Sequence, residues 1–254
     1  MFEILADLSP TTLALACAVA VLAGLVKGLV GFAMPMVLIS GLSTVIVPEL
    51  ALAGLILPTL VTNGMQALRQ GGSSAWQSIL KFRAFLLIGL VMLLFSAQLV
   101  RVLPQGTLLL LIGIPITGFA ILQLLGWQLK LSGRDRRVEI GVGAFAGLVG
   151  GFSGVWGPPT VAYLTALNTE KTEQMRVQGV IYGLGAAALF IAHIGSGVVT
   201  SYTLPFSAVL IIPAVLGMWV GGKLQDKIDQ VRFRQATLVV LVVAGFNLII
   251  RGMT

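Results

Sequence analysis

The sequence carries little charge and almost no side chains suited to disulfide formation or metal binding. Its 254 residues include one cysteine, Cys17, and one histidine, His193. A single cysteine excludes an intramolecular disulfide, and one Cys with one His cannot supply the ligand set of a zinc or iron–sulfur site. Charged residues make up 10% of the chain and aromatic residues 7%, whereas soluble domains carry about 25% charge. We therefore expect neither a metal site nor a cofactor.

Apolar residues and glycine are in excess. Hydrophobic residues make up 57% of the chain, the mean hydropathy is +1.01, and 31 residues are glycine. Such a chain is typical of closely packed or broken helices inside a lipid bilayer. The formal charge of +7 would suggest nucleic acid as a partner of a soluble protein. Here the basic residues lie in connections between apolar runs, where they set membrane orientation, so we expect no nucleic acid.

Six apolar runs are long enough to cross the bilayer, for which a helix needs about 20 residues. Two further runs, about 11–47 and 138–168, are interrupted by glycine and proline. The sequence predicts one crossing for each uninterrupted run and a broken helix in each of the other two. The uninterrupted runs cover about 50–68, 84–103, 107–127, 177–196, 203–222 and 235–251. The interrupting residues are Gly28, Gly31 and Pro35 in the first broken run, and Gly150, Gly151, Gly154, Gly157, Pro158 and Pro159 in the second.

The two broken runs are similar to each other in sequence. Residues 24–37, GLVKGLVGFAMPMV, and residues 147–160, GLVGGFSGVWGPPT, share six identities in fourteen at a constant spacing of 123. Chance matches between glycines are the alternative, but the identities include Pro35 with Pro158. The pattern predicts a duplication, with an N-terminal repeat over 1–127, a cytoplasmic linker over 128–137 and a C-terminal repeat over 138–254.

The distribution of Lys and Arg predicts how the repeats cross the membrane. If each broken run crossed once, the two sides would carry eight and seven basic residues. If each broken run enters and leaves on one side, with both termini outside, thirteen basic residues lie inside and only Arg101 and Arg251 outside, with Lys27 in the membrane. The positive-inside rule favours this second arrangement.

Three crossings and one broken run in each half turn the second half upside down relative to the first, as in many secondary transporters. The predicted fold class is an all-α integral membrane protein of two inverted repeats, each with one broken helix and three transmembrane helices. Charge does not distinguish a re-entrant hairpin from two full crossings. Length favours re-entrance, because a helix over Pro158–Asn168 is only about 16 Å long.

Broken helices near mid-membrane are where such transporters bind substrate, because half-helix N-termini present unpaired N–H groups and positive dipole ends. Pro35 and Pro158 suit the first turn of a new helix, since proline lacks the N–H group. We expect the two breaks to face each other around an anion-sized cavity. The alternative is that the glycines only allow close helix crossing.

Lys27 is the one basic side chain within either broken run, and Gly150 takes its place in the other repeat. A cation in the membrane is usually functional, so Lys27 is the candidate counter-charge for an anion; snorkelling to an interface is the alternative. Trp156 either lines the cavity or belongs to an interfacial belt. The candidate substrate-binding residues are Lys27, Gly28, Gly31, Phe32, Met34, Pro35 and Asn63 in the first half, and Gly151, Ser153, Gly154, Trp156, Gly157, Pro158 and Gln178 in the second.

An enzyme is the alternative from a different class. Residues 151–154, Gly-Phe-Ser-Gly, match the GxSG motif of rhomboid-like intramembrane serine proteases, and His193 lies on a following crossing. The repeat argues against this interpretation, because Val30 stands in the first half where Ser153 stands in the second. We therefore expect no enzyme activity.

The paired segments GLVKGLVGFAMPMV and GLVGGFSGVWGPPTVAYL, each opening one half of the chain, resemble the sulfite exporter TauE/SafE family of membrane transporters. The resemblance implies a multi-pass protein of the bacterial inner membrane that moves sulfite, thiosulfate, sulfonates or related anions. In that family the first break often runs through consecutive glycines, where this chain has Phe32-Ala33-Met34. We expect a secondary transporter of small sulfur anions working by alternating access, with another organic anion, such as a carboxylate, as the alternative substrate.

Overall fold

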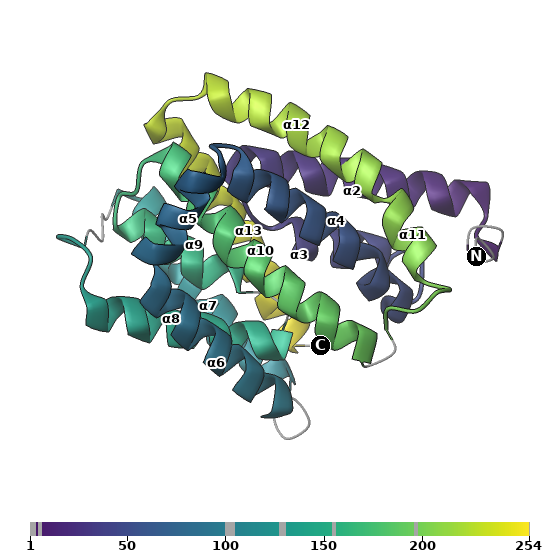
Figure 1. The fold of residues 1–254 in the computed structure, drawn as a ribbon, viewed down its shortest axis with the longest axis horizontal. Coiled ribbons are helices and arrows are strands. Elements are labelled where there is room, and N and C mark those ends of the chain that lie inside the picture. The colour runs from purple at the N-terminus through teal and green to yellow at the C-terminus, as the bar shows by residue number, and fades with distance from the viewer. Residues whose placement is uncertain are drawn as a thin grey trace. The chain divides into compact units, whose positions relative to one another are not determined.

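The computed structural model describes residues 4, 7–99, 105–126, 131–153, 156–195 and 198–253. The regular elements within these ranges are α-helices, which confirms the predicted all-α class (Figure 1). In chain order they are α2 (Pro10–Val30), α3 (Met34–Leu42), α4 (Pro48–Leu68), α5 (Gly72–Lys81), α6 (Arg83–Leu99), α7 (Gln105–Leu124), α8 (Arg136–Ser153), α9 (Gly157–Ala166), α10 (Lys171–Gly195), α11 (Leu204–Val209), α12 (Ile211–Lys227) and α13 (Gln230–Met253).

Several of these helices are long and apolar enough to cross a membrane. Among the described residues, four spans meet that condition by length and composition, and a fifth is added if α5 and α6, which are bent by 75° at their junction, are counted as one. The spans are Pro10–Val30, Leu50–Leu68, Leu204–Lys227 and Gln230–Met253. The third joins α11 and α12 across Leu210.

The chain folds into two compact units. Unit 1 comprises Met1–Gly71 and Gly179–Ile228, and unit 2 comprises Gly72–Gln178 and Asp229–Thr254. Unit 1 therefore takes one segment from each side of the predicted 128–137 linker, whereas the first segment of unit 2 contains that linker. The boundaries 1–127 and 138–254 describe a duplication of sequence, and that duplication stays a prediction.

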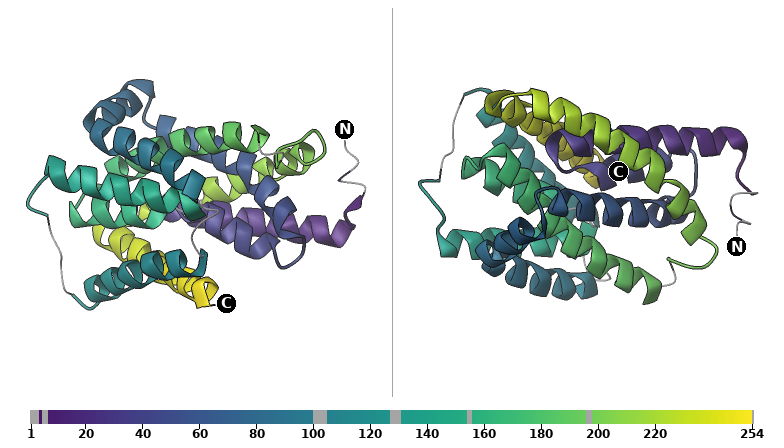
Figure 2. Two further views of the ribbon diagram at one scale, coloured as in Figure 1. Left: turned by 90° about the horizontal axis from the view of Figure 1, so that it is seen from below. Right: turned by 45° about the horizontal axis from the view of Figure 1, so that its top comes forward.

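Unit 1 is built on the close pairing of α2 with α12, which run side by side in Figures 1 and 2. Glycines bring the two backbones together: a Cβ added to Gly24 would collide with the carbonyl oxygen of Ala214, and one added to Gly28 with that of Met218. Helix α2 continues through Gly28, so the prediction that Gly28 interrupts the helix is wrong. Its missing side chain serves helix packing instead.

In unit 2, helices α6 and α8 also pack closely at a glycine. A Cβ added to Gly147 would collide with the carbonyl oxygen of Gly89. Helix α8 runs on through Gly150 and Gly151 to Ser153, so these two glycines do not interrupt it, contrary to the prediction. Helices α7 and α13 form the other close pair of unit 2 (Figure 2).

The short helices differ in how well the sequence predicted them. Helices α3 and α9 follow the two breaks, as expected, with nine and ten residues. Their lengths of about 13 and 15 Å are far below the roughly 30 Å of a bilayer core. Helix α5 lies between the predicted crossings 50–68 and 84–103, where the sequence indicated only a connection.

Candidate functional site

The first helix break is formed by three residues between α2 and α3. Gly31 ends α2 in the left-handed conformation, with φ of 87°, and its N–H donates to the carbonyl oxygen of Lys27 at 2.7 Å. Such a C-cap favours glycine because it has no Cβ. Ala33 also has a positive φ, of 69°, which strains a residue with a side chain and is typical of functional segments. Helix α3 then begins at Met34 with Pro35 in its first turn, as predicted.

Lys27 lies in the last turn of α2, directly before this break. The residue is 1% exposed, and its ammonium group donates to Oδ1 of Asn63 on α4. Since this group is bonded inside unit 1, the snorkelling alternative is wrong. A buried ammonium is costly without a counter-charge, and the ion pairs found among the described residues do not include Lys27.

Helix α4 supplies the polar side chains that face the break. Asn63 bonds to Lys27, and Gln66, one turn later, donates from Nε2 to the carbonyl oxygen of Gly31 at 3.1 Å. Thr62 donates to the carbonyl oxygen of Pro58 at 2.6 Å and contacts Sδ of Met34 at 3.2 Å. One face of α4 thus contacts the cation and the residues Gly31 and Met34 on the two sides of the break.

The structure brings together only part of the predicted first-half site. Lys27, Gly31 and Asn63 are joined by the contacts above, whereas Gly28 faces α12. Phe32 and Met34 are buried apolar residues. Gln66 is not among the residues that the sequence predicted for the site. Its spacing of three residues from Asn63, on one helix face, was the signal that could have identified it.

The second break, in unit 2, is also followed by a short helix. Helix α9 begins at Gly157, with Pro158 in its first turn as predicted. Trp156 is 8% exposed, and a Cβ added to Gly150 would lie 2.9 Å from Cε3 of its ring. Its burial contradicts the alternative of an interfacial belt. Thr160 donates from Oγ1 to the carbonyl oxygen of Trp156 at 3.0 Å.

The structure describes the positions of some, but not all, of the remaining candidate residues of the second half. Gly151 lies within α8, Ser153 is its last residue, and Gln178 is buried on α10. Gly154 lies outside the described residues. These positions leave the predicted binding roles of the second break as proposals.

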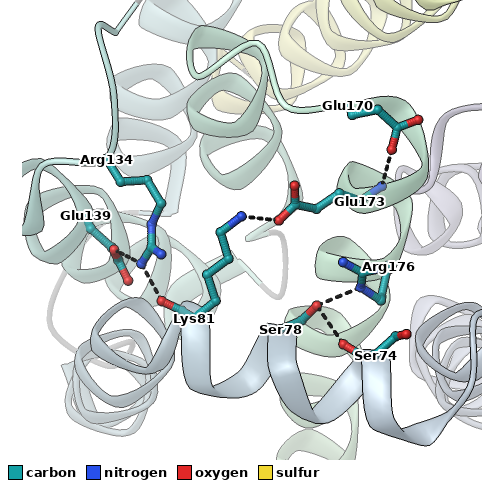
Figure 3. Close-up of polar contacts among 8 residues, drawn as sticks. All are labelled: Ser74, Ser78, Lys81, Arg134, Glu139, Glu170, Glu173 and Arg176. Carbon is teal, nitrogen blue, oxygen red and sulfur yellow. Dashed lines mark hydrogen bonds and ion pairs between the residues drawn. The ribbon is translucent and has the colours of Figure 1, made fainter.

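A buried carboxylate belongs to a structural ion pair of unit 2. Glu139, predicted at the edge of a crossing, is buried in the first turn of α8. Its carboxylate pairs with Arg134 (Figure 3). It also accepts the N–H of Phe85 at 3.3 Å. Within the described ranges, no group of three or more Cys, His, Asp or Glu side chains could hold a metal ion.

Comparison with known protein families identifies the class of this protein. The sequence model of the family described as "Sulfite exporter TauE/SafE" matches residues 16–248, nearly the whole chain. The chain belongs to the TauE/SafE family. No curated protein and no solved structure matches it. Membership confirms the resemblance carried by the paired breaks, and makes the protein a multi-pass membrane transporter of the sulfite-exporter type with a small anionic substrate.

Proposed function

We propose that this protein is a secondary transporter of sulfur oxyanions or organosulfonates in the bacterial inner membrane, and that the anion binds beside Lys27 at the first helix break. The observation that carries the proposal is that the positive charge of Lys27 is buried beside a neutral partner. Its ammonium group is enclosed and bonded to a neutral amide. The C-terminal dipole of α2 and the Asn63 oxygen offset part of the desolvation penalty. A bound anion supplies the full negative charge that these groups lack.

The start of α3 supplies further groups suited to an anion. Helix α3 has no side chain bonded to its N-terminus, and Pro35 contributes no N–H. The N–H of Val37 already bonds to the carbonyl oxygen of Ala33 at 3.0 Å. The N–H groups from Phe32 to Met36, with the positive end of the α3 dipole, are therefore those we assign to anion binding. Helix α9 offers an equivalent start in unit 2, with Pro158 in its first turn and no side-chain cap.

Alternating access in many transporters uses two related halves, and the packing inside each unit supports that part of the proposal. The α2–α12 pair of unit 1 corresponds to the α8–α6 pair of unit 2, because α2 and α8 open the two repeats. The buried Ser207 of α11 bonds to the backbone of α4, at 3.2 Å from the carbonyl oxygen of Gly54. Ser78 of α5 bonds to Arg176 of α10 at 2.8 Å. In both units a serine on a short helix contacts the long helix that follows the other repeat's break.

The chemistry of the substrate rests on the family. Sulfite, thiosulfate and sulfonates carry several oxygen acceptors around one sulfur, which suits an ammonium group combined with backbone N–H donors. A carboxylate presents only two oxygens in one plane. We therefore place sulfur oxyanions before carboxylates as substrates.

Flux measurements in proteoliposomes test this function. Purified protein should move labelled sulfite, thiosulfate or a short sulfonate faster than labelled acetate or chloride. Lys27→Gln should lose most of that flux, whereas Lys227→Gln, an exposed lysine at the end of α12, should keep it. Faster flux of the carboxylate would make the alternative substrate class correct. Equal flux in the two lysine variants would contradict the assigned site.

A further inference from the structure

Helix α5 makes an abrupt angle with the helix that follows it. Gly72–Lys81 is bent by 75° from Arg83–Ser96, the apolar first part of α6. Helix α6 carries a line of exposed apolar side chains at Leu87, Val91 and Leu94, on one face by their helical spacing. In a membrane transporter that line faces acyl chains. A helix at 75° to α6 then runs close to the plane of the membrane.

One face of α5 is fixed to other parts of unit 2 (Figure 3). Ser78 accepts a hydrogen bond from Nε of Arg176 at 2.8 Å, and Lys81 forms an ion pair with Glu173; both partners lie at the start of α10. The guanidinium of Arg134 donates to the carbonyl oxygen of Lys81. These contacts set the rotation of α5 about its own axis.

The opposite face of α5 presents large apolar side chains. Trp76 is 59% and Leu80 50% exposed, and a spacing of four residues places them on one side of the helix. Arg83 is exposed just after the end of α5. A tryptophan, a leucine and an adjacent arginine form the combination typical of helices that lie in the headgroup region.

We propose that α5 is an interfacial helix that inserts Trp76 and Leu80 at the boundary between lipid headgroups and acyl chains, with Arg83 beside the lipid phosphates. Lipid is the occupant that the surroundings favour, because the exposed apolar line of α6 follows α5 directly in the chain. The ten residues of α5 extend only about 15 Å, half of a bilayer core. The arginine complements anionic headgroups. This placement does not depend on Lys27 or on the substrate.

Depth measurements on spin labels test the placement. Single cysteines replace Trp76, Leu80, Leu87, Val91 and Gly133 in a Cys17→Ala background. The purified variants are reconstituted in vesicles of phosphatidylethanolamine and phosphatidylglycerol. Leu87→Cys and Val91→Cys give the reference for acyl chains, and Gly133→Cys, in the exposed connection before α8, gives the reference for water. The readout is the relative accessibility of each label to oxygen and to a water-soluble nickel complex.

Labels at positions 76 and 80 should lie about 5–10 Å below the phosphates, more protected from nickel than the label at 133 and shallower than those at 87 and 91. Nickel accessibility equal to that of position 133 would place this face in water and overturn the proposal. A depth equal to that of positions 87 and 91 would make α5 part of a broken span and would overturn it as well. If Trp76→Cys does not fold, Leu80→Cys alone gives the same decision.

Discussion

The two helix breaks share a sequence pattern of glycine and proline but exchange a large and a small side chain. In unit 1 the pattern has Lys27 and Ala33; at the aligned positions unit 2 has Gly150 and Trp156. The Lys27 ammonium bonds to Asn63 in the first break, whereas the Trp156 ring packs against Gly150 in the second. The comparison separates two roles. Proline lies in the first turn of the helix after each break, and the side chain at position 27 brings a charge to the first break.

The close helix pairs, by contrast, are alike in the two units. Gly24 packs against the backbone of Ala214 in unit 1, and Gly147 packs against Gly89 in unit 2. Gly24 and Gly147 are aligned at the spacing of 123 that relates the breaks. The shared glycines therefore explain packing, and the differing residues at the breaks are where a difference in function is to be sought.

The largest expected effect comes from substitution of the glycines at which the helices of each close pair meet. Gly24→Leu and Gly147→Leu should each abolish the yield of folded protein, because the new side chain meets backbone on the partner helix. Gly64→Ala and Gly141→Ala are matched controls, since no atom lies within 4 Å of an added Cβ there. Their stability should stay equal or rise by about 0.5–1 kcal/mol. Yield and thermal unfolding in detergent measure both. Normal folding of either leucine variant would contradict the packing.

A second change tests whether the Trp156 side chain packs the second break. Trp156→Ala should lower stability by about 3–5 kcal/mol, as expected for a large side chain removed from a packed interior. Trp219→Ala is the control, because Trp219 is 59% exposed on α12. Its effect should stay below about 1 kcal/mol. Thermal unfolding of the two variants compares them directly. Equal effects would show that Trp156 does not fill the break.

A third change removes the unbalanced charge of the first break without touching Lys27. Asn63→Asp places a carboxylate at the contact with Lys27, so it competes with the bound anion. Anion affinity should fall on the order of tenfold to a hundredfold. Asn63→Gln keeps a neutral amide and should fall much less. Calorimetric titration with sulfite measures both. Equal affinity of Asn63→Asp and the unchanged protein would show that the anion does not sense this charge.

The smallest expected effect concerns Ser153, aligned with Val30 of the first break. Ser153→Ala should keep most of the transport rate, because a helix break needs no nucleophile. Serine-reactive fluorophosphonate probes should leave the protein unlabelled. Labelling of Ser153 that disappears in His193→Ala would favour the protease alternative.

Much of this architecture follows from local sequence. Apolar length predicted the long helices, and proline after glycine predicted that α3 and α9 start around Pro35 and Pro158. Gly28, Gly150 and Gly151 were misjudged as breaks, because glycine destabilises an isolated helix by only about 1 kcal/mol. At Gly28 the close packing of α12 outweighs that amount, and at Gly150 the contact with the Trp156 ring does.

Two features depended on tertiary contacts that the sequence does not specify. Helix α5 is short and rich in serine, and its buried face is recognisable only once Arg176 and Glu173 lie against it. Gln66 is one of several amides on apolar helices. Its role became visible only when the fold placed the Gly31 carbonyl within reach. The pairing of Asn63 with Lys27 came closest to prediction, because both were already candidates on neighbouring segments.

The affinity of the purified protein for sulfite, with and without the Lys27 charge, is the most direct test of the proposed site. Isothermal calorimetry on Lys27→Gln and Lys27→Met should show binding weakened about tenfold to a hundredfold, since a charge-assisted hydrogen bond contributes about 1.5–3 kcal/mol. Lys227→Gln should bind as the unchanged protein does. Unchanged affinity in both Lys27 variants, with normal folding, would contradict the assignment of Lys27 as the counter-charge of the substrate.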